Sequence, residues 1–318
     1  QHSGSISSRS RQPNSIQRFL GSRFLYRRLA DQGSRAPMIE DPTPTPSIPV
    51  PAKGTRVTPP VRFESGQRTV WILPSEMDLV RDCGFLGGIA SVHPEQHRSG
   101  REPHPVYRGT DGSLLLWKRC LRGGWLSHFI STLHLSCARF LREMEMGEET
   151  RILGIPTSNV IAVASTAATI GQRVEMLIRL ENDVQTLKQF LEDQMPSDEQ
   201  RRAVLKATAE TIQKFHQAGF LHGDLNLMNI LIQQREGEFP RAILVDLDPG
   251  GLAPLANRHS NLTRLIRSYR KSIGLNTPPL RIGEAIRFIH GVTGADRDRM
   301  RSLITASQQY LPRSQWRR

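Results

Sequence analysis

The sequence has few cysteines and no long hydrophobic run. Cys83, Cys120 and Cys137 are widely spaced and form no C-x-x-C pair. This spacing argues against a disulfide framework and a zinc site, and it favours a reducing compartment. No apolar stretch approaches the roughly 18 residues of a membrane span, so we expect a protein that touches a membrane without crossing it. Aromatic residues interleaved with basic ones are also lacking, which argues against specific recognition of nucleic acid.

Acidic residues are scarce relative to basic ones. The chain of 318 residues has 30 Asp and Glu against 43 Lys and Arg, and its net charge is +13. Such an excess implies a polyanionic partner, which is nucleic acid, an anionic membrane surface, or a phosphorylated or acidic substrate. Charge alone does not choose among these partners.

Hydrophobic residues make up only 37% of the chain, and the shortage lies mainly in the first sixty residues. Residues 1–36 are basic and nearly free of acids, which predicts a disordered tail. Within this tail, 16–29 has an amphipathic helical pattern, so a membrane-surface anchor or a transit peptide is the alternative. The prolines of 37–64 predict an extended linker, because proline fixes φ and has no N–H to donate. The folded domain is expected at 65–318.

Downstream of residue 65 the patterns predict strands first and helices later. Strands are expected at 105–108, 114–118, 160–163, 174–178, 230–232 and 242–245. Helices are expected at 137–152, ending at Gly154, and from Ser197, where Gln200 completes a capping box, to Gly219. This order predicts an α+β fold with two lobes. The small sheet-rich N-lobe would span about 65–180, and the helical C-lobe about 181–318.

One segment has a pattern typical of phosphoryl transfer. It reads LHGDLNLMNIL over 221–231 and is followed by LVDLD over 244–248. The reaction requires a carboxylate to hold the acceptor hydroxyl and take its proton, and hard oxygen ligands to hold Mg²⁺ against the phosphates. Asp224 suits the first role, and Asn229 with Asp246 suits the second. A hairpin between these two segments would bring Asp246 near Asn229.

Upstream residues agree with a nucleotide-binding lobe. Lys118 ends a predicted strand and suits the α- and β-phosphates of ATP, and Glu143 on the following helix is placed to pair with it. Three other acids of the same helix are alternative partners, namely Glu145, Glu148 and Glu149. Gly100, eighteen residues before Lys118, is the candidate remnant of a phosphate-covering glycine loop, although no G-x-G-x-x-G is present.

Each of these residue types also has a plainer explanation. Asp or Asn in a loop is usually turn chemistry, two acids beside apolar strands also suit calcium, and a strand lysine is usually solvated. The conjunction argues against these explanations, since lysine, helix, loop, hairpin and second aspartate all occur in the expected order. We therefore predict an ATP- and Mg²⁺-dependent phosphotransferase with a two-lobed protein-kinase-like fold.

Five stretches resemble the lipopolysaccharide kinase family of Gram-negative bacteria, and most of all its 3-deoxy-D-manno-octulosonic acid (Kdo) kinases. Residues 222–231 and 246–248 are similar to the H-x-D-L-N-x-x-N-I-L loop and the D-F-D strand end of that family. Residues 118–124, 142–156 and 261–268 are similar to its R-G-G turn, its helix C with the exit, and its late basic helix. The resemblance covers roughly 97–272.

The resemblance implies roles for individual residues. Asp224 would be the active-site acid/base, Lys118 and Glu143 the nucleotide-side pair, and Asn229 with Asp246 the metal ligands. The acceptor would be a sugar hydroxyl on a lipid-anchored inner-core saccharide, with the enzyme peripheral on the cytoplasmic face of the inner membrane. The excess of arginine fits a substrate and a membrane that are both anionic.

The chain departs from the family pattern in ways that leave the acceptor open. Leu247 replaces the aromatic of D-F-D, Pro249 follows Asp248, and the basic proline-rich extension is foreign to the family. An atypical protein Ser/Thr kinase is one alternative, although Asp248 occupies the place of the usual third-position glycine and no A-P-E segment follows. A non-catalytic basic pseudokinase that binds a partner is the other. The full set of reactive residues argues against it.

Overall fold

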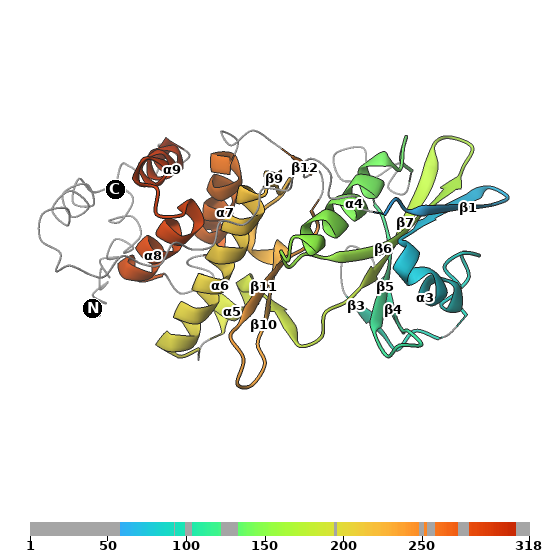
Figure 1. Ribbon diagram of the computed structural model, residues 1–318, viewed down its shortest axis with the longest axis horizontal. Coiled ribbons are helices and arrows are strands. Elements are labelled where there is room, and N and C mark those ends of the chain that lie inside the picture. Colours follow the sequence, from blue (N-terminus) through green and yellow to red (C-terminus); the bar gives the residue numbers. More distant parts are fainter. Residues whose placement is uncertain are drawn as a thin grey trace, which may run out of the picture.

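The computed structural model describes residues 58–91, 93–98, 104–121, 133–193, 196–247, 251–252, 258–272 and 280–309. The predictions for 1–57, the candidate Gly100 and the R-G-G turn at 122–124 lie outside these ranges, as do Asp248 and Pro249. Figure 1 shows a sheet-rich part, coloured blue to green, beside a helical part coloured yellow to red. The α+β fold with a sheet-rich and a helical part is thus confirmed.

The sheet-rich part is built on one antiparallel sheet of seven strands in the order β1-β2-β6-β7-β5-β4-β3. Its strands are β1 Val61–Ser65, β2 Arg68–Ile72, β3 Gln96–Arg98, β4 His104–Arg108, β5 Leu114–Arg119, β6 Asn159–Ala167 and β7 Gln172–Arg179. The predicted hairpin is β4 with β5, in which Val106 pairs with Leu116. β1 overlaps the end of the predicted proline-rich linker, at 61–64. It is a strand there because it pairs with β2 across a turn at Gly66, whose φ is 58°.

A helix covers each face of this sheet. On one face, α4 (Ala138–Ile152) packs Phe140 and Met144 against a core that includes Cys120 and Met176. The other face is covered by α3 (Met77–Asp82), which follows the 3-10 turn η1 (Pro74–Glu76). The sequence patterns did not predict either element. Because side chains alternate along a strand, Trp117 is buried on the α3 side and Lys118 projects toward α4.

The helical part surrounds α6, the long helix predicted from Ser197. Its helices are α5 Leu187–Glu192, α6 Asp198–Gln217, α7 Arg258–Ser272, α8 Ile282–Thr293 and α9 Arg297–Gln309. The Ser197 side chain accepts from the Gln200 backbone N–H and the Gln200 side chain reaches back, which confirms the capping box. No helix in the described residues is both long and apolar enough to span a bilayer.

The helical part also contains two small sheets of short strands, which hold its loops together. A three-stranded sheet has the order β11-β10-β8, and β9 pairs with β12. The bounds are β8 Val184–Thr186, β9 Phe220–Leu221, β10 Ile230–Gln233, β11 Arg241–Leu244 and β12 Gly251–Leu252. β10 and β11 form the predicted antiparallel hairpin, with Ile230 opposite Leu244.

Backbone hydrogen bonds tie the exit of α4 to β11. The Leu244 N–H donates to the Pro156 carbonyl at 3.0 Å, and the Ser158 N–H donates to the Leu244 carbonyl at 2.8 Å. The end of α4 therefore lies beside the strand that leads to Asp246. This contact fixes the sheet-rich part against the helical part at the position of the predicted reactive residues.

Candidate active site

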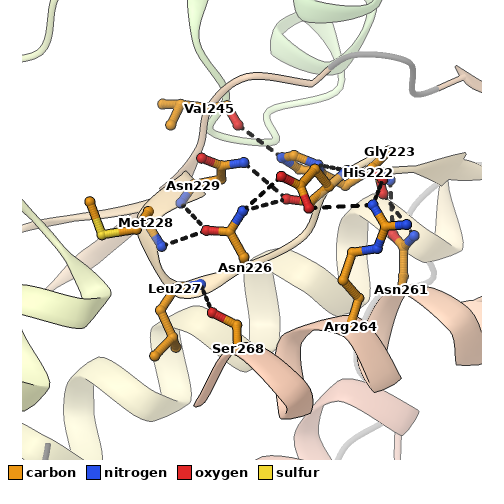
Figure 2. A network of polar contacts seen from close by, with 11 residues as sticks. His222, Gly223, Asn226, Leu227, Met228, Asn229, Val245, Asn261, Arg264 and Ser268 are labelled. Atoms are coloured by element: carbon orange, nitrogen blue, oxygen red, sulfur yellow. Dashed lines mark hydrogen bonds and ion pairs between the residues drawn. The ribbon is translucent and has the colours of Figure 1, made fainter. Parts of the chain in front are cut away.

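The segment after β9 folds into a loop held by its own asparagines (Figure 2). Asn226 caps the 3-10 turn η3 (Leu227–Asn229), because its Oδ1 accepts from the Met228 and Asn229 backbone N–H groups. The Nδ2 groups of Asn226 and Asn229 both donate to the Asp224 carbonyl, at 3.0 and 2.9 Å. Asn226 Nδ2 also donates to Asp224 Oδ2 at 3.1 Å. The backbone on either side of Asp224 is thus fixed, while its carboxylate is 60% exposed.

His222 holds this loop against the hairpin. The Asp224 backbone N–H donates to His222 Nδ1 at 3.1 Å, so Nε2 carries the proton and donates to the Val245 carbonyl at 2.8 Å. Burial lowers the pKa of His222, which favours the same neutral form. A neutral imidazole therefore connects the backbone of Asp224 to the residue before Asp246.

The β10–β11 hairpin brings its two ends together, as the sequence predicted. Asn229 precedes β10, and its carbonyl accepts from the Val245 backbone N–H at 3.0 Å, directly before Asp246. Asp246 has φ 54°, in the left-handed region that non-glycine residues rarely adopt. Strained backbone of this kind is concentrated at functional sites. Leu247, at the position of the family's aromatic, is fully buried in the core of the helical part.

Lys118 and Asp246 form an ion pair across 128 positions of sequence. Lys118 Nζ lies 2.8 Å from Asp246 Oδ1, and the two side chains are 29% and 52% exposed. Burial alone would lower the pKa of Lys118, but the charge and hydrogen bond of Asp246, with a further contribution from Glu143, raise it. Lys118 is therefore a fixed cation at the junction of the two parts.

Glu143 is the buried acid of α4. It is 6% exposed, whereas the side chains of the three alternative partners are 23% to 43% exposed. Burial raises the pKa of Glu143 to about 7. The charge of Lys118 lowers this pKa, and the charge of Asp246 raises it further. Lys118 pairs with Asp246 in this structure, and Glu143 acts on both through its charge.

The raised pKa of Glu143 makes folding stability depend on pH. The folded chain keeps this proton where the unfolded chain, with an ordinary value of 4.5, has lost it. Glu143 therefore favours folding at low pH, and this contribution is lost as pH rises through about 7. We expect wild type to lose about 1 kcal/mol relative to Glu143→Gln between pH 6 and pH 8. Urea unfolding at both pH values measures this difference.

Glu145→Gln is the matched control for that experiment, because it removes a 43% exposed carboxylate from the same helix. Its stability difference from wild type should be the same at pH 6 and at pH 8. A Glu143→Gln difference that does not change with pH would contradict the raised pKa.

The donor set at the hairpin ends fits Mg²⁺. Asn229 directs Nδ2 to the Asp224 carbonyl, which leaves its amide oxygen as the atom for a cation, and Asp246 supplies a carboxylate. In the described part of the chain, no three His, Cys, Asp or Glu side chains gather into a metal cluster. Mg²⁺ commonly takes one or two carboxylates and completes its shell with phosphate and water oxygens. Asp246 and Asn229 therefore suit Mg²⁺ better than zinc.

Two site neighbours were not assigned a role from the sequence. Arg264 on α7 lies 3.3 Å from Asp224 Oδ1, and Asn261 on the same helix contacts His222. The available signal was a row of polar residues at helical spacing, Asn261, Arg264 and Ser268, within a helix that otherwise buries Leu262 and Leu265. Nothing in the local sequence indicates which loop such a row contacts.

A sheet-bound lysine paired with an aspartate at the end of a hairpin, beside a loop with Asp224 and Asn229, is the arrangement of a kinase-like phosphotransferase. The sequence model of the "Lipopolysaccharide kinase (Kdo/WaaP) family" matches residues 104–291, more than half of the chain. The chain belongs to this family and is a phosphotransferase.

Curated relatives agree with this assignment. The chain is 25% identical over 190 residues to a 3-deoxy-D-manno-octulosonic acid kinase of Xylella fastidiosa strain M12, covering 55% of this chain and 73% of the relative. It is 29% identical over 143 residues to the enzyme of the same name from Haemophilus influenzae strain 86-028NP, covering 44% and 57%. A solved structure, "WaaP in complex with acyl carrier protein", aligns with a TM-score of 0.47 and 16% identity over 67% of this chain and 87% of that one.

Proposed function

We propose that this protein transfers the γ-phosphoryl group of ATP to a sugar hydroxyl, of Kdo or a similar sugar, on a lipid-linked inner-core saccharide. The observation that carries the proposal is the 2.8 Å ion pair of Lys118 with Asp246, which joins the cation of the sheet to the carboxylate of the hairpin. The family match and the names of the relatives support a lipopolysaccharide sugar as acceptor.

In this proposal each side chain has one task. Asp224 accepts the proton of the attacking hydroxyl at its exposed carboxylate. Lys118 binds the α- and β-phosphates, with Glu143 beside it, and Asn229 with Asp246 holds the metal. Mg²⁺, when bound, neutralises charge on the nucleotide phosphates. Positioning and neutralisation of charge account for most of the catalysis in such a site.

We further propose that the enzyme acts as a peripheral protein against an anionic membrane, on its cytoplasmic face. The excess of basic residues, 43 against 30 acidic ones, supports this location, because basic surfaces are attracted to anionic lipid headgroups. The acceptor carries its own anionic groups, so the same charge would favour the substrate.

A transfer assay with γ-labelled ATP tests the proposed acceptor. Lipid-linked Kdo, total lipid without Kdo, and a mixture of protein acceptors are offered separately, each with Mg²⁺ and with EDTA. We expect label in lipid-linked Kdo only, and only with Mg²⁺, because Asn229, one of the proposed metal ligands, contacts the Asp224 carbonyl. Treatment of the product with mild acid, which releases Kdo, should release the label with the sugar.

The other arms separate the alternatives. Label in the protein mixture alone would replace the proposal by a protein kinase. Nucleotide binding without transfer to any acceptor would favour the pseudokinase. Asp78→Asn on α3 is the matched control variant, because it removes an aspartate whose side chain is 89% exposed and should transfer like wild type.

A further inference from the structure

One face of α7 lies along the loop that contains Asp224 (Figure 2). Asn261, Arg264 and Ser268 are three and four residues apart, which places them on the same side of a helix. They contact successive points of the loop in order: His222, then Gly223 with Asp224, then Leu227. Helix and loop are about 40 positions apart in sequence, so the packing of the helical part alone creates this contact.

Asn261 and Ser268 hold the backbone at the two ends of the loop. Asn261 is buried, its Oδ1 accepts from the His222 N–H at 2.8 Å, and its Nδ2 donates to the His222 carbonyl at 2.8 Å. Ser268 Oγ accepts from the Leu227 N–H at 3.2 Å. The main chain of the loop is thus held at His222 and at Leu227 by contacts that do not involve Arg264.

Arg264 contacts the carboxylate itself. Its Nη1 donates to the Gly223 carbonyl and lies 3.3 Å from Asp224 Oδ1, while Asn226 donates to Oδ2. The two carboxylate oxygens are therefore held by different partners. With Asn226 alone, the carboxylate would be free to turn about its Cβ–Cγ bond, whereas the second donor fixes its plane.

We propose that Arg264 is a positioning residue for phosphoryl transfer, which orients the Asp224 carboxylate toward the acceptor hydroxyl. This inference rests on the proposed function, in which Asp224 takes the hydroxyl proton. The pair is exposed, 52% for Arg264 and 60% for Asp224, and exposed ion pairs contribute little to folding stability. Loss of Arg264 should therefore change the geometry of the reaction and leave the fold intact.

The test compares Arg264→Ala with Lys271→Ala, which removes an exposed cation from the same helix. For Arg264→Ala we expect kcat to fall about 10- to 100-fold, the usual effect of a misplaced reacting group. The KM for ATP should stay within about twofold, because Lys118 and Asp246 are unchanged. Arg264→Lys should recover part of the lost kcat. Melting temperatures and the kinetics of Lys271→Ala should match wild type.

Added guanidinium at low millimolar concentration distinguishes positioning from a structural role. The space left by the exposed side chain admits the ion, so kcat of Arg264→Ala should rise several-fold while Lys271→Ala and Asp224→Asn should not respond. Wild-type kcat in Arg264→Ala, or a loss of melting temperature without rescue, would overturn the inference. Wild-type turnover in Asp224→Asn would instead overturn the proposed function, so the two failures are distinguishable.

Discussion

Asp224→Asn is expected to lower kcat for phosphoryl transfer by about 10²- to 10⁴-fold, the contribution of a positioned general base. Asparagine keeps the size of the side chain and an oxygen for Arg264 or Asn226, but it cannot accept the hydroxyl proton. The affinity for Mg²⁺-ATP should stay within about threefold, because the affected interaction lies on the acceptor side. Single-turnover transfer and nucleotide binding, measured separately, check the two halves of this expectation.

The exposed Asp78→Asn variant serves as the charge control for this experiment. Asp224→Asn could instead bind nucleotide poorly and transfer the phosphoryl group of bound ATP at the normal rate. That result would place Asp224 on the nucleotide side. Retained wild-type turnover would remove it from the chemistry altogether.

Asp246→Asn is expected to weaken binding of Mg²⁺-ATP by about 100-fold, because it replaces the carboxylate that we propose as a metal ligand. This is the upper end of the effect of losing an outer-shell partner of a metal. Asparagine tolerates the left-handed backbone at φ 54°, so the change isolates the charge from backbone strain. Loss of the Asp246 carboxylate should also release Lys118 from its ion pair. Nucleotide binding measured with Mg²⁺ and with EDTA should therefore differ strongly in wild type and little in the variant.

Asp298→Asn on α9 removes a carboxylate that is 93% exposed and should bind Mg²⁺-ATP like wild type. If Asp246→Asn binds Mg²⁺-ATP with wild-type affinity, the metal is not held by this carboxylate. If Asp246→Asn also lowers the melting temperature strongly, the loss of affinity would be a structural effect. Melting curves of the variant and of wild type therefore accompany the binding measurement.

Some of the proposed site residues could be grouped from sequence spacing alone, whereas another required knowledge of the packing. Asp224 and Asn229 belong to one loop, and a hairpin of two apolar strands links them to Asp246, so near-neighbour spacing was enough to place them together. Glu143 was one of four acids on a helix. Only packing distinguishes it from the other three, because the fold buries Glu143 and leaves Glu145, Glu148 and Glu149 partly exposed.

Other features required the assembled fold. α3 is a short helix whose sequence has no strong cap, and it forms because Leu79 and Val80 complete the core on the second face of the sheet. β1 follows a proline-rich stretch and is stabilised by its pairing with β2. Strand pairing and burial depend on distant residues, so local propensity gives little warning of either.

Local sequence patterns were enough to predict β4 to β7, β10, β11, α4 and α6, and to propose Asp224, Asn229 and Asp246 as the reactive residues. Hydrophobic periodicity, capping residues and the spacing of Asp224, Asn229 and Asp246 are local properties, because helices, turns and hairpins are made from neighbouring residues. The pairing of Lys118 with Asp246, and the contact of Arg264 on α7 with Asp224, could be found only in the folded structure. Those contacts join residues 128 and 40 positions apart, and they form only when the packing of buried faces fixes how the elements lie against one another.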